Sequence, residues 1–214
     1  MGTSSARGDV AKAAIVEAAE RLFAEHGIAG VSLRDISVAA GQRNNSAAQY
    51  HFGDRAGLVV AVFEHRMSPV DERRRVLLAD LGSAGRLDDL PALVEAVVAP
   101  LVEAVAEADG WYGRFLARTR WEPAVWERIG TLPAAESFRD AAVLIIRCVD
   151  VPHPIRRSRV DQLVTLVMGT IAGWEGAPER GERRLPVPVL VAELVSTGVA
   201  LLTAPVTAFE GTPT

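Results

Sequence analysis

The sequence lacks the features that build disulfides, zinc sites and membrane spans. Cys148 is the only cysteine among 214 residues, so no intramolecular disulfide can form, and no cysteine–histidine spacing matches a zinc site. It lies in the apolar run 143–151, which favours a buried, inert thiol over a redox sensor. No apolar run reaches ~18 residues, and residues 1–9 lack the apolar core of a signal peptide. We therefore expect a soluble, cytoplasmic protein without a metal or other cofactor.

Lysine is also nearly absent, and the chain carries no excess of positive charge. Lys12 is the single lysine beside 22 arginines, and the formal net charge is −4. This charge excludes a protein that coats nucleic acid by bulk attraction. It does not exclude sequence-specific DNA binding, which needs only a local basic surface.

Signatures of catalysis are missing as well. The four histidines have no partner at the spacing of a triad or metal site, and no glycine-rich phosphate loop is present. Acidic residues are spaced like exposed charges on helices. We therefore expect a binding protein, not an enzyme.

What the sequence does contain is a long series of apolar stripes at helical spacing. Apolar residues make up 49% of the chain, and one stripe runs from Ile15 to Phe23 and is closed by Gly27. The pattern predicts an all-α fold of about nine helices: 10–26, 33–40, 45–51, 55–80, 89–108, 111–120, 124–149, 155–176 and 187–204. Pro100 is expected to kink or split its helix. The predicted organisation is a flexible arm (1–9), a helix-turn-helix domain (10–53), a larger helical domain for effector binding and dimerisation (54–206) and a tail (207–214).

Residues 32–52 have the pattern of a helix-turn-helix. Ser32 and Asp35 form a capping-box-like start, and a short helix ends at Gly41 before a polar turn and a second short helix. The outer side of that second helix is almost wholly polar. Asparagine and glutamine can pair with adenine, and arginine with guanine, in the major groove. The candidates are Arg43, Asn44, Asn45, Ser46 and Gln49.

Amides alone do not distinguish this helix from an ordinary polar surface helix. The context does, because small Ala47 and Ala48 follow a glycine turn and precede the aromatic cluster Tyr50-His51-Phe52. Such a combination is unusual for a purely solvated helix. It favours a helix that is packed on one side and free to enter a groove on the other.

The stretch 15–66 resembles the DNA-binding domain of the TetR family of bacterial repressors. The matching features are Ala18-Ala19, Leu22-Phe23, Gly27, Ser32, Ala39-Ala40-Gly41, Tyr50-His51-Phe52 and Arg55. The stretch between Gly41 and Tyr50 is one residue longer than in the commonest pattern. Gln49 also stands where the family usually has a phosphate-contacting tyrosine. A subset of the family with the segment GQRNNSAxQYHFGDR shares both departures.

The resemblance implies roles for the site residues. Ser32, Tyr50 or His51, and Arg55 would hold phosphates, while the polar residues of 43–49 would face the bases. Hydroxyls and backbone amides at helix starts are natural phosphate ligands, so physical chemistry supports part of these implied roles. For His51, an aromatic cap between helices is an equal alternative. The family also implies a repressor that acts as a homodimer.

Two stripes in the C-terminal half suggest where a homodimer would form. They recur at intervals of three and four residues, which suits near-parallel helix packing, and the resemblance implies a four-helix interface. An alternative is that both stripes face the core of the single chain. The candidate interface residues are Val160, Val164, Val167, Ile171, Val191, Leu194, Gly198 and Leu201.

Aromatic residues gather between 111 and 138 and suggest an effector cavity, although core packing explains any one of them. The candidate ligand-binding residues are Trp111, Phe115, Trp121, Trp126, Phe138 and Met168. The sequence thus predicts a regulator that binds double-stranded DNA at a palindromic operator and is released by a small-molecule effector. The alternative is a helical binding or scaffold protein without sequence-specific DNA binding.

Overall fold

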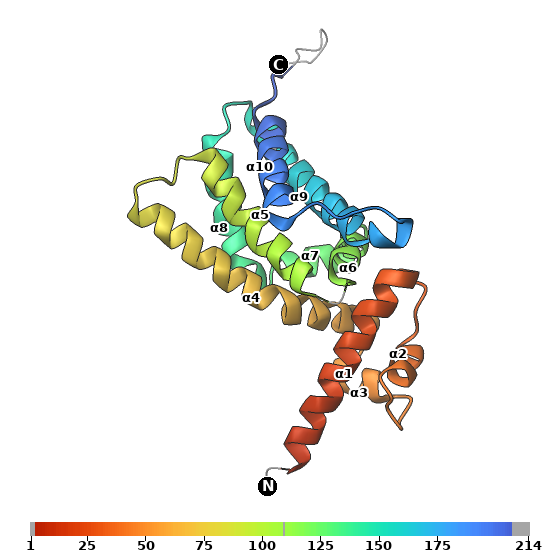
Figure 1. Ribbon diagram of the computed structural model, residues 1–214. Coiled ribbons are helices and arrows are strands. Elements are labelled where there is room, and N and C mark those ends of the chain that lie inside the picture. The colour runs from red at the N-terminus through yellow and green to blue at the C-terminus, as the bar shows by residue number, and fades with distance from the viewer. Residues whose placement is uncertain (1–2, 109, 207–214) are drawn as a thin grey trace, which may run out of the picture.

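The computed structural model describes residues 3–108 and 110–206, and side chains from residue 8 onward. The tail predicted over 207–214 lies outside the described residues. Within them the chain is all-α, as predicted, with two short 3₁₀ turns and no strand (Figure 1). The helices are α1 (Thr3–His26), α2 (Leu33–Ala39), α3 (Ala47–Phe52), α4 (Arg55–Ser83), α5 (Leu90–Glu107), α6 (Tyr112–Thr119), α7 (Pro123–Gly130), α8 (Glu136–Cys148), α9 (His153–Glu175) and α10 (Val187–Thr203), with η1 (Pro133–Ala135) and η2 (Pro178–Arg180).

At two prolines the helices differ from those predicted. The helix expected over 124–149 is divided into α7, η1 and α8, because Pro133 starts a separate turn. This division accounts for the tenth helix. Pro100, in contrast, does not split α5, which runs unbroken around it, and the proline is buried in the core.

The first helix begins earlier than the apolar stripe indicates. It starts at Thr3, seven residues before Val10, so residues 3–9, predicted as part of a flexible arm, continue the helix instead. Gly27 follows the last turn with a φ of 78°, a left-handed conformation that glycine adopts without strain.

The ten helices are arranged as a small N-terminal unit beside a larger body. Helices α2 and α3 pack on α1, while α5, α8, α9 and α10 lie over α4 in the larger body (Figure 1). Helix α4 begins against α3 and α1 and then continues beneath α5 and α8, so that it belongs to both parts. Helix α6 packs between α1 and α9 and forms the second connection.

One apolar core runs through both parts. It includes Ile15, Phe23 and Ile36 in the N-terminal unit and Leu93, Phe115 and Ile171 in the larger body, all fully buried. None of the described helices combines the length and apolar character that a membrane crossing requires.

Candidate functional site

The start of α2 is fixed by a capping box. The Ser32 hydroxyl accepts a hydrogen bond from the Asp35 amide at 3.1 Å, and the Asp35 carboxylate accepts one from the Ser32 amide at 3.3 Å. The Ser32 hydroxyl also donates to that carboxylate, and these bonds lower the pKa of Asp35 below its ordinary value. The Ser32 hydroxyl proton is therefore engaged within the helix cap.

Ser37 sets the angle between α2 and α3. Its hydroxyl is fully buried, donates to the Leu33 carbonyl at 2.9 Å and accepts from the Ala48 amide at 3.0 Å. Ala47 and Ala48 are also buried, so the backbone of α3 comes close to α2. A buried amide without an acceptor is costly, so this one hydroxyl holds the second helix in place. Its sequence signal was faint, because a serine within a helix is usually exposed.

The predicted base-reading residues occupy two kinds of structure. Helix α3 begins at Ala47, two residues later than predicted, so Arg43, Asn44, Asn45 and Ser46 lie in the turn before it and only Gln49 lies on it. All five side chains are exposed.

Hydrogen bonding separates these polar side chains further. The Asn44 side-chain oxygen accepts from the Ser46 amide at 3.0 Å and shapes the turn. Within the described part of the chain, Arg43, Asn45 and Gln49 form no side-chain hydrogen bond and are free to bind a partner.

The candidate phosphate ligands lie at the end of α3 and the start of α4. Tyr50 is 83% exposed, whereas His51 is half-buried and makes edge contacts with Tyr50 at 5.0 Å and Phe52 at 6.2 Å between ring centroids. Both of the alternatives predicted for His51 fit this position.

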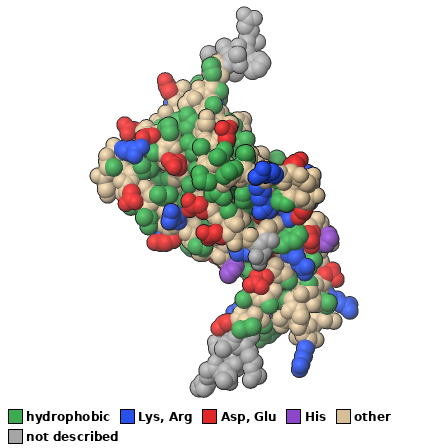
Figure 2. Space-filling view, viewed as in Figure 1, with side chains coloured by type: hydrophobic (Ala, Val, Ile, Leu, Met, Phe, Trp, Pro, Cys, Tyr) green, Lys and Arg blue, Asp and Glu red, His purple; other side chains and the backbone are tan. Residues whose placement is uncertain are grey.

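Arg55 occupies the first turn of α4, directly after its cap Asp54, and is exposed. A positive side chain at a helix N-terminus is electrostatically unfavourable by itself, and an anion bound there would offset that cost. Basic side chains, coloured blue, project from the lower right of Figure 2, where α2 and α3 lie.

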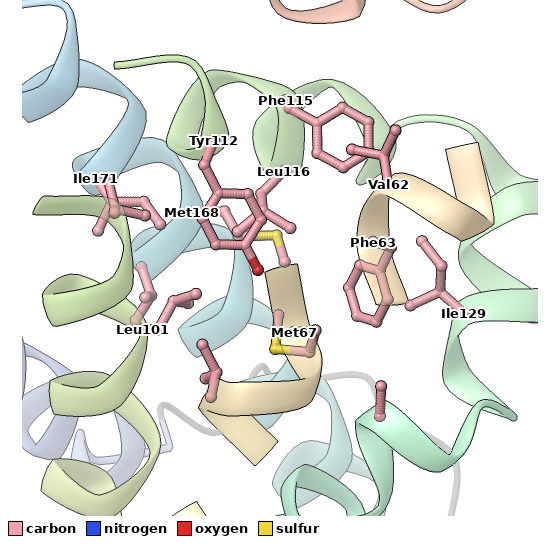
Figure 3. Close-up of a cluster of buried hydrophobic side chains, with 14 of the residues drawn as sticks. Val62, Phe63, Met67, Leu101, Tyr112, Phe115, Leu116, Ile129, Met168 and Ile171 are labelled. Carbon is pink, nitrogen blue, oxygen red and sulfur yellow. The ribbon is translucent and has the colours of Figure 1, made fainter. Parts of the chain in front are cut away.

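The larger body contains an apolar cavity of about 180 Å³ between α4, α5, α7, α8 and α9. Of the predicted ligand-binding residues, Trp126, Phe138 and Met168 line it. Sequence reasoning missed the others that line it, including Phe63, Met67, Arg74 and Ile129. Figure 3 shows Phe63, Met67, Ile129 and Met168 converging from α4, α7 and α9.

The other three predicted aromatics lie outside the lining of this cavity. Phe115 is fully buried and stacks on Phe23 of α1, with ring centroids 6.4 Å apart. Trp121 is 72% exposed, and the Arg114 guanidinium lies over the Trp111 ring at 4.4 Å. Aromatic clustering along the sequence found the region but could not separate the cavity from the contact between α1 and α6.

Helix α6 is anchored to α9 by a buried carboxylate. Glu175 is 2% exposed and accepts hydrogen bonds from the Gly113 and Arg114 amides, both at 2.9 Å. It thereby caps the N-terminus of α6 from another helix, as acidic groups favour.

Most of the predicted dimer-interface residues pack inside the single chain. Val160, Val167, Ile171, Leu194 and Gly198 are buried in its core, and a Cβ at Gly198 would lie 2.8 Å from the Leu163 side chain. Val164, Val191 and Leu201 are partly exposed. The stripes at 3.5-residue spacing therefore bring α9 and α10 together with α5, which was the alternative considered above.

The outer face of α9 and α10 is formed by other residues. Hydrophobic side chains gather where α5 and α10 lie in Figure 2, and Val189 of α10 is 45% exposed. On α9 the exposed residues include Gly169 and Gly173, around which a Cβ would meet nothing within 4 Å.

Comparison with known proteins supports the N-terminal assignment. Residues 15–62 match the model of the bacterial regulatory proteins of the tetR family. The chain is similar in fold to the crystal structure of a protein from Rhodococcus sp. assigned to the TetR-family transcriptional regulators, with a TM-score of 0.52 and 17% identity over 91% of this chain and 100% of that one. PfmR, a TetR-family transcriptional regulator from Thermus thermophilus, aligns with 14% identity over 91% of this chain and 96% of its own, at a TM-score of 0.49. A search of the curated proteins finds no match.

Proposed function

We propose that the protein is a transcriptional repressor that binds a palindromic operator as a homodimer and releases it when a small molecule enters the cavity. The observation that supports DNA binding most directly is the exposed, unpartnered Asn45 and Gln49 on a helix-turn-helix whose residues 15–62 match the tetR family model. Their amides have the geometry that pairs with adenine in the major groove.

The proposed contacts divide into two groups. Arg43, Asn44, Asn45, Ser46 and Gln49 face the bases, and Ser32, Tyr50, His51 and Arg55 face phosphates. Ser32 can serve a phosphate only by giving up its bond to Asp35, so its backbone amide and hydroxyl are the weakest members of the set. Arg55 is the strongest, because its charge lacks a carboxylate partner within 4 Å in the described part of the chain.

A homodimer would form through the outer face of α9 and α10. These two helices pack side by side, and their outward residues include small or apolar ones, Gly169, Gly173 and Val189, beside charged ones such as Asp161 and Glu193. A two-fold symmetric dimer places two recognition helices for half-sites ~34–36 Å apart.

The switch requires a path from the cavity to the DNA-binding helices. Helix α4 lines the cavity with Phe63 and Met67 and begins at Arg55, next to the recognition helix. Pro69 lies within α4, where its missing amide weakens the helix locally. An effector that prefers one arrangement of α4 and α6 would shift the spacing of the recognition helices, provided that it binds the two states with different affinity.

The test is fluorescence anisotropy of the purified protein on DNA from upstream of its own gene, with a salt series. We expect tight, salt-sensitive binding that an Asn45→Ala/Gln49→Ala double variant loses, while an Arg147→Gln variant, changed at the exposed end of α8, keeps it. If neither this DNA nor a genome-wide pull-down yields binding above random sequence, the protein is a helical small-molecule-binding or scaffold protein instead. An effector that leaves operator affinity unchanged would remove the switch from the proposal.

A further inference from the structure

Arg74 of α4 is buried with too few partners. It is 2% exposed and lines the apolar cavity. Its two Nη atoms donate to the Ser137 hydroxyl and the Val97 carbonyl, each at a long 3.3 Å, and its Nε has no partner. A guanidinium carries five N–H donors, so most of its capacity is unused by the protein.

The positive charge of Arg74 is also incompletely matched. In the described part of the chain no carboxylate oxygen lies within 4 Å of it. The nearby Asp71 carboxylate is occupied by the Ser137 amide at 2.9 Å, the Ser137 hydroxyl at 2.6 Å and the Arg75 side chain. Burial lowers the pKa of Arg74 to about 10, opposed by the charge of Asp71, so the guanidinium stays charged at neutral pH.

A second buried donor lies beside the residues that line this cavity. Tyr112 of α6 is fully buried, and its hydroxyl has no hydrogen-bond partner in the protein. Figure 3 shows that hydroxyl among Met67, Leu101 and Met168, which all line the cavity. Burial raises the pKa of Tyr112, and the charge of Arg74 counters that rise, so the two groups are within electrostatic reach of each other.

Two buried donors without acceptors, one of them charged, therefore lie at this mostly apolar cavity: Arg74 in its lining and Tyr112 just behind the lining. Buried donors without acceptors are rare in native proteins, and a few convergent polar groups in an apolar pocket are typical of a ligand site. The remaining walls are apolar, with Phe63, Trp126 and Ile129 among them, except for the exposed Arg139, which donates hydrogen bonds to the Gly130 and Leu132 carbonyls.

We propose that the cavity binds an amphipathic anion, whose carboxylate or similar oxyanion accepts hydrogen bonds from Arg74 and Tyr112 while its apolar body packs against the aromatic wall. The proposal rests on the proposed function in one respect, that this cavity is the effector site. It defines the chemical class of the effector: an anion with a hydrophobic body, in preference to a neutral or cationic analogue of the same shape.

The test is isothermal titration calorimetry on the full chain without DNA, using probes that differ only in the polar end. Decanoate is compared with 1-decanol and decylamine, 2-naphthoate with 2-naphthol, and decyl phosphate with decanoate to separate the two oxyanions. We expect at least one anion to bind about tenfold or more tightly than its neutral analogue. The net charge of −4 works against unspecific attraction of anions, so such a preference must come from the site.

Variants assign the preference to these residues. Arg74→Met should abolish it, and Tyr112→Phe should weaken anion binding severalfold. Arg73→Met, at the adjacent exposed position of α4, should leave it unchanged. Circular dichroism identifies a variant that does not fold, and in that event the preference of the wild-type protein decides the question.

Equal binding of anion and alcohol, an anion preference that survives in folded Arg74→Met, or binding of no anion in the panel would each overturn the proposal. DNA binding is measured separately, so the two proposals fail independently. A chain that binds anions but no operator would remove the repressor function and keep this inference. A chain that binds its operator but shows no anion preference would keep the repressor function and remove this inference.

Discussion

The carboxylate of Glu20 accepts two hydrogen bonds from the guanidinium of Arg66, at 2.6 and 3.0 Å, and so ties α1 to α4. Glu20 is 2% exposed, and the paired geometry is the strong form of an arginine–carboxylate contact. Because α1 belongs to the N-terminal unit and α4 lines the cavity, this ion pair is a direct polar link between the two parts.

Loss of that link should destabilise the protein. Glu20→Gln removes the charge and one of the two strong acceptors, and we expect a loss of about 1.5–3 kcal/mol in the free energy of unfolding, measured from the urea midpoint. Glu17→Gln, one turn earlier on the exposed side of α1, is the matched control and should change stability little. Equal effects of the two substitutions would show that the pair contributes nothing.

Removal of the Ser37 hydroxyl should damage the helix-turn-helix itself. Ser37→Ala leaves the buried Ala48 amide without its acceptor, which costs about 1–3 kcal/mol and loosens α3. Operator affinity should fall together with thermal stability. Ser46→Ala, whose side chain makes no cap hydrogen bond, should leave stability within about 0.5 kcal/mol of wild type. Normal stability and affinity in Ser37→Ala would contradict the positioning role.

Arg55 should contribute to affinity but not to sequence preference. If it neutralises one phosphate, Arg55→Gln weakens binding to the operator and to random DNA by the same factor. It should also lower the slope of log K against log salt by about 0.9. Anisotropy titrations at several salt concentrations measure both quantities. A change in the ranking of operator variants would instead place Arg55 at the bases.

The proposed dimer face can be tested by adding bulk where the single chain has room. A Cβ at Gly169 would meet nothing within 4 Å in the protomer, so Gly169→Arg should fold normally yet run as a monomer in sedimentation velocity and lose operator binding. Gly82→Arg, at the far end of α4, should stay dimeric. A dimeric Gly169→Arg would move the interface elsewhere.

Cys148 should be a slow nucleophile. Burial raises the pKa of its thiol above the ordinary 9.0, so at pH 8 less than about one thiol in ten is the reactive thiolate. Reaction with Ellman's reagent at pH 8 should be slower in the folded protein than in urea and should accelerate only above pH 9. Rapid modification at pH 7 would revive the redox-sensor interpretation of the sequence.

The sequence was most informative where local rules and packing agree. The capping box at Ser32, the glycine after α1 and the small residues of α3 all specify local geometry, and the apolar stripes at helical spacing predicted the all-α fold. The start of α3 was misjudged because Asn44 uses its side chain to make a turn, which keeps Asn45 and Ser46 outside the helix. That the segment 41–55 groups with one subset of the family stays a prediction.

The cavity was less predictable, because its polar residues look like surface charges in the sequence. Arg74 stands in the run Asp71-Glu72-Arg73-Arg74-Arg75, which is typical of a solvated helix face. Only its spacing of seven from Met67, along the same helix face, signals burial. Helical spacing likewise could not tell a face toward a second copy from a face toward α5, which is why Gly198 was assigned to the wrong neighbour.

Helix α3 has only six residues and is therefore about 9 Å long, enough to run past about three base pairs. In the proposed dimer, two such helices would contact about six base pairs, a sequence that recurs by chance about once in 4,000 base pairs, against ~10⁶ or more competing sites in a genome. A recognition helix this short cannot specify one promoter through its own base contacts. Specificity would also have to come from the distance between the two half-sites and from the turn residues beside each helix. A small molecule that alters only that distance would then abolish operator recognition without changing a single base contact.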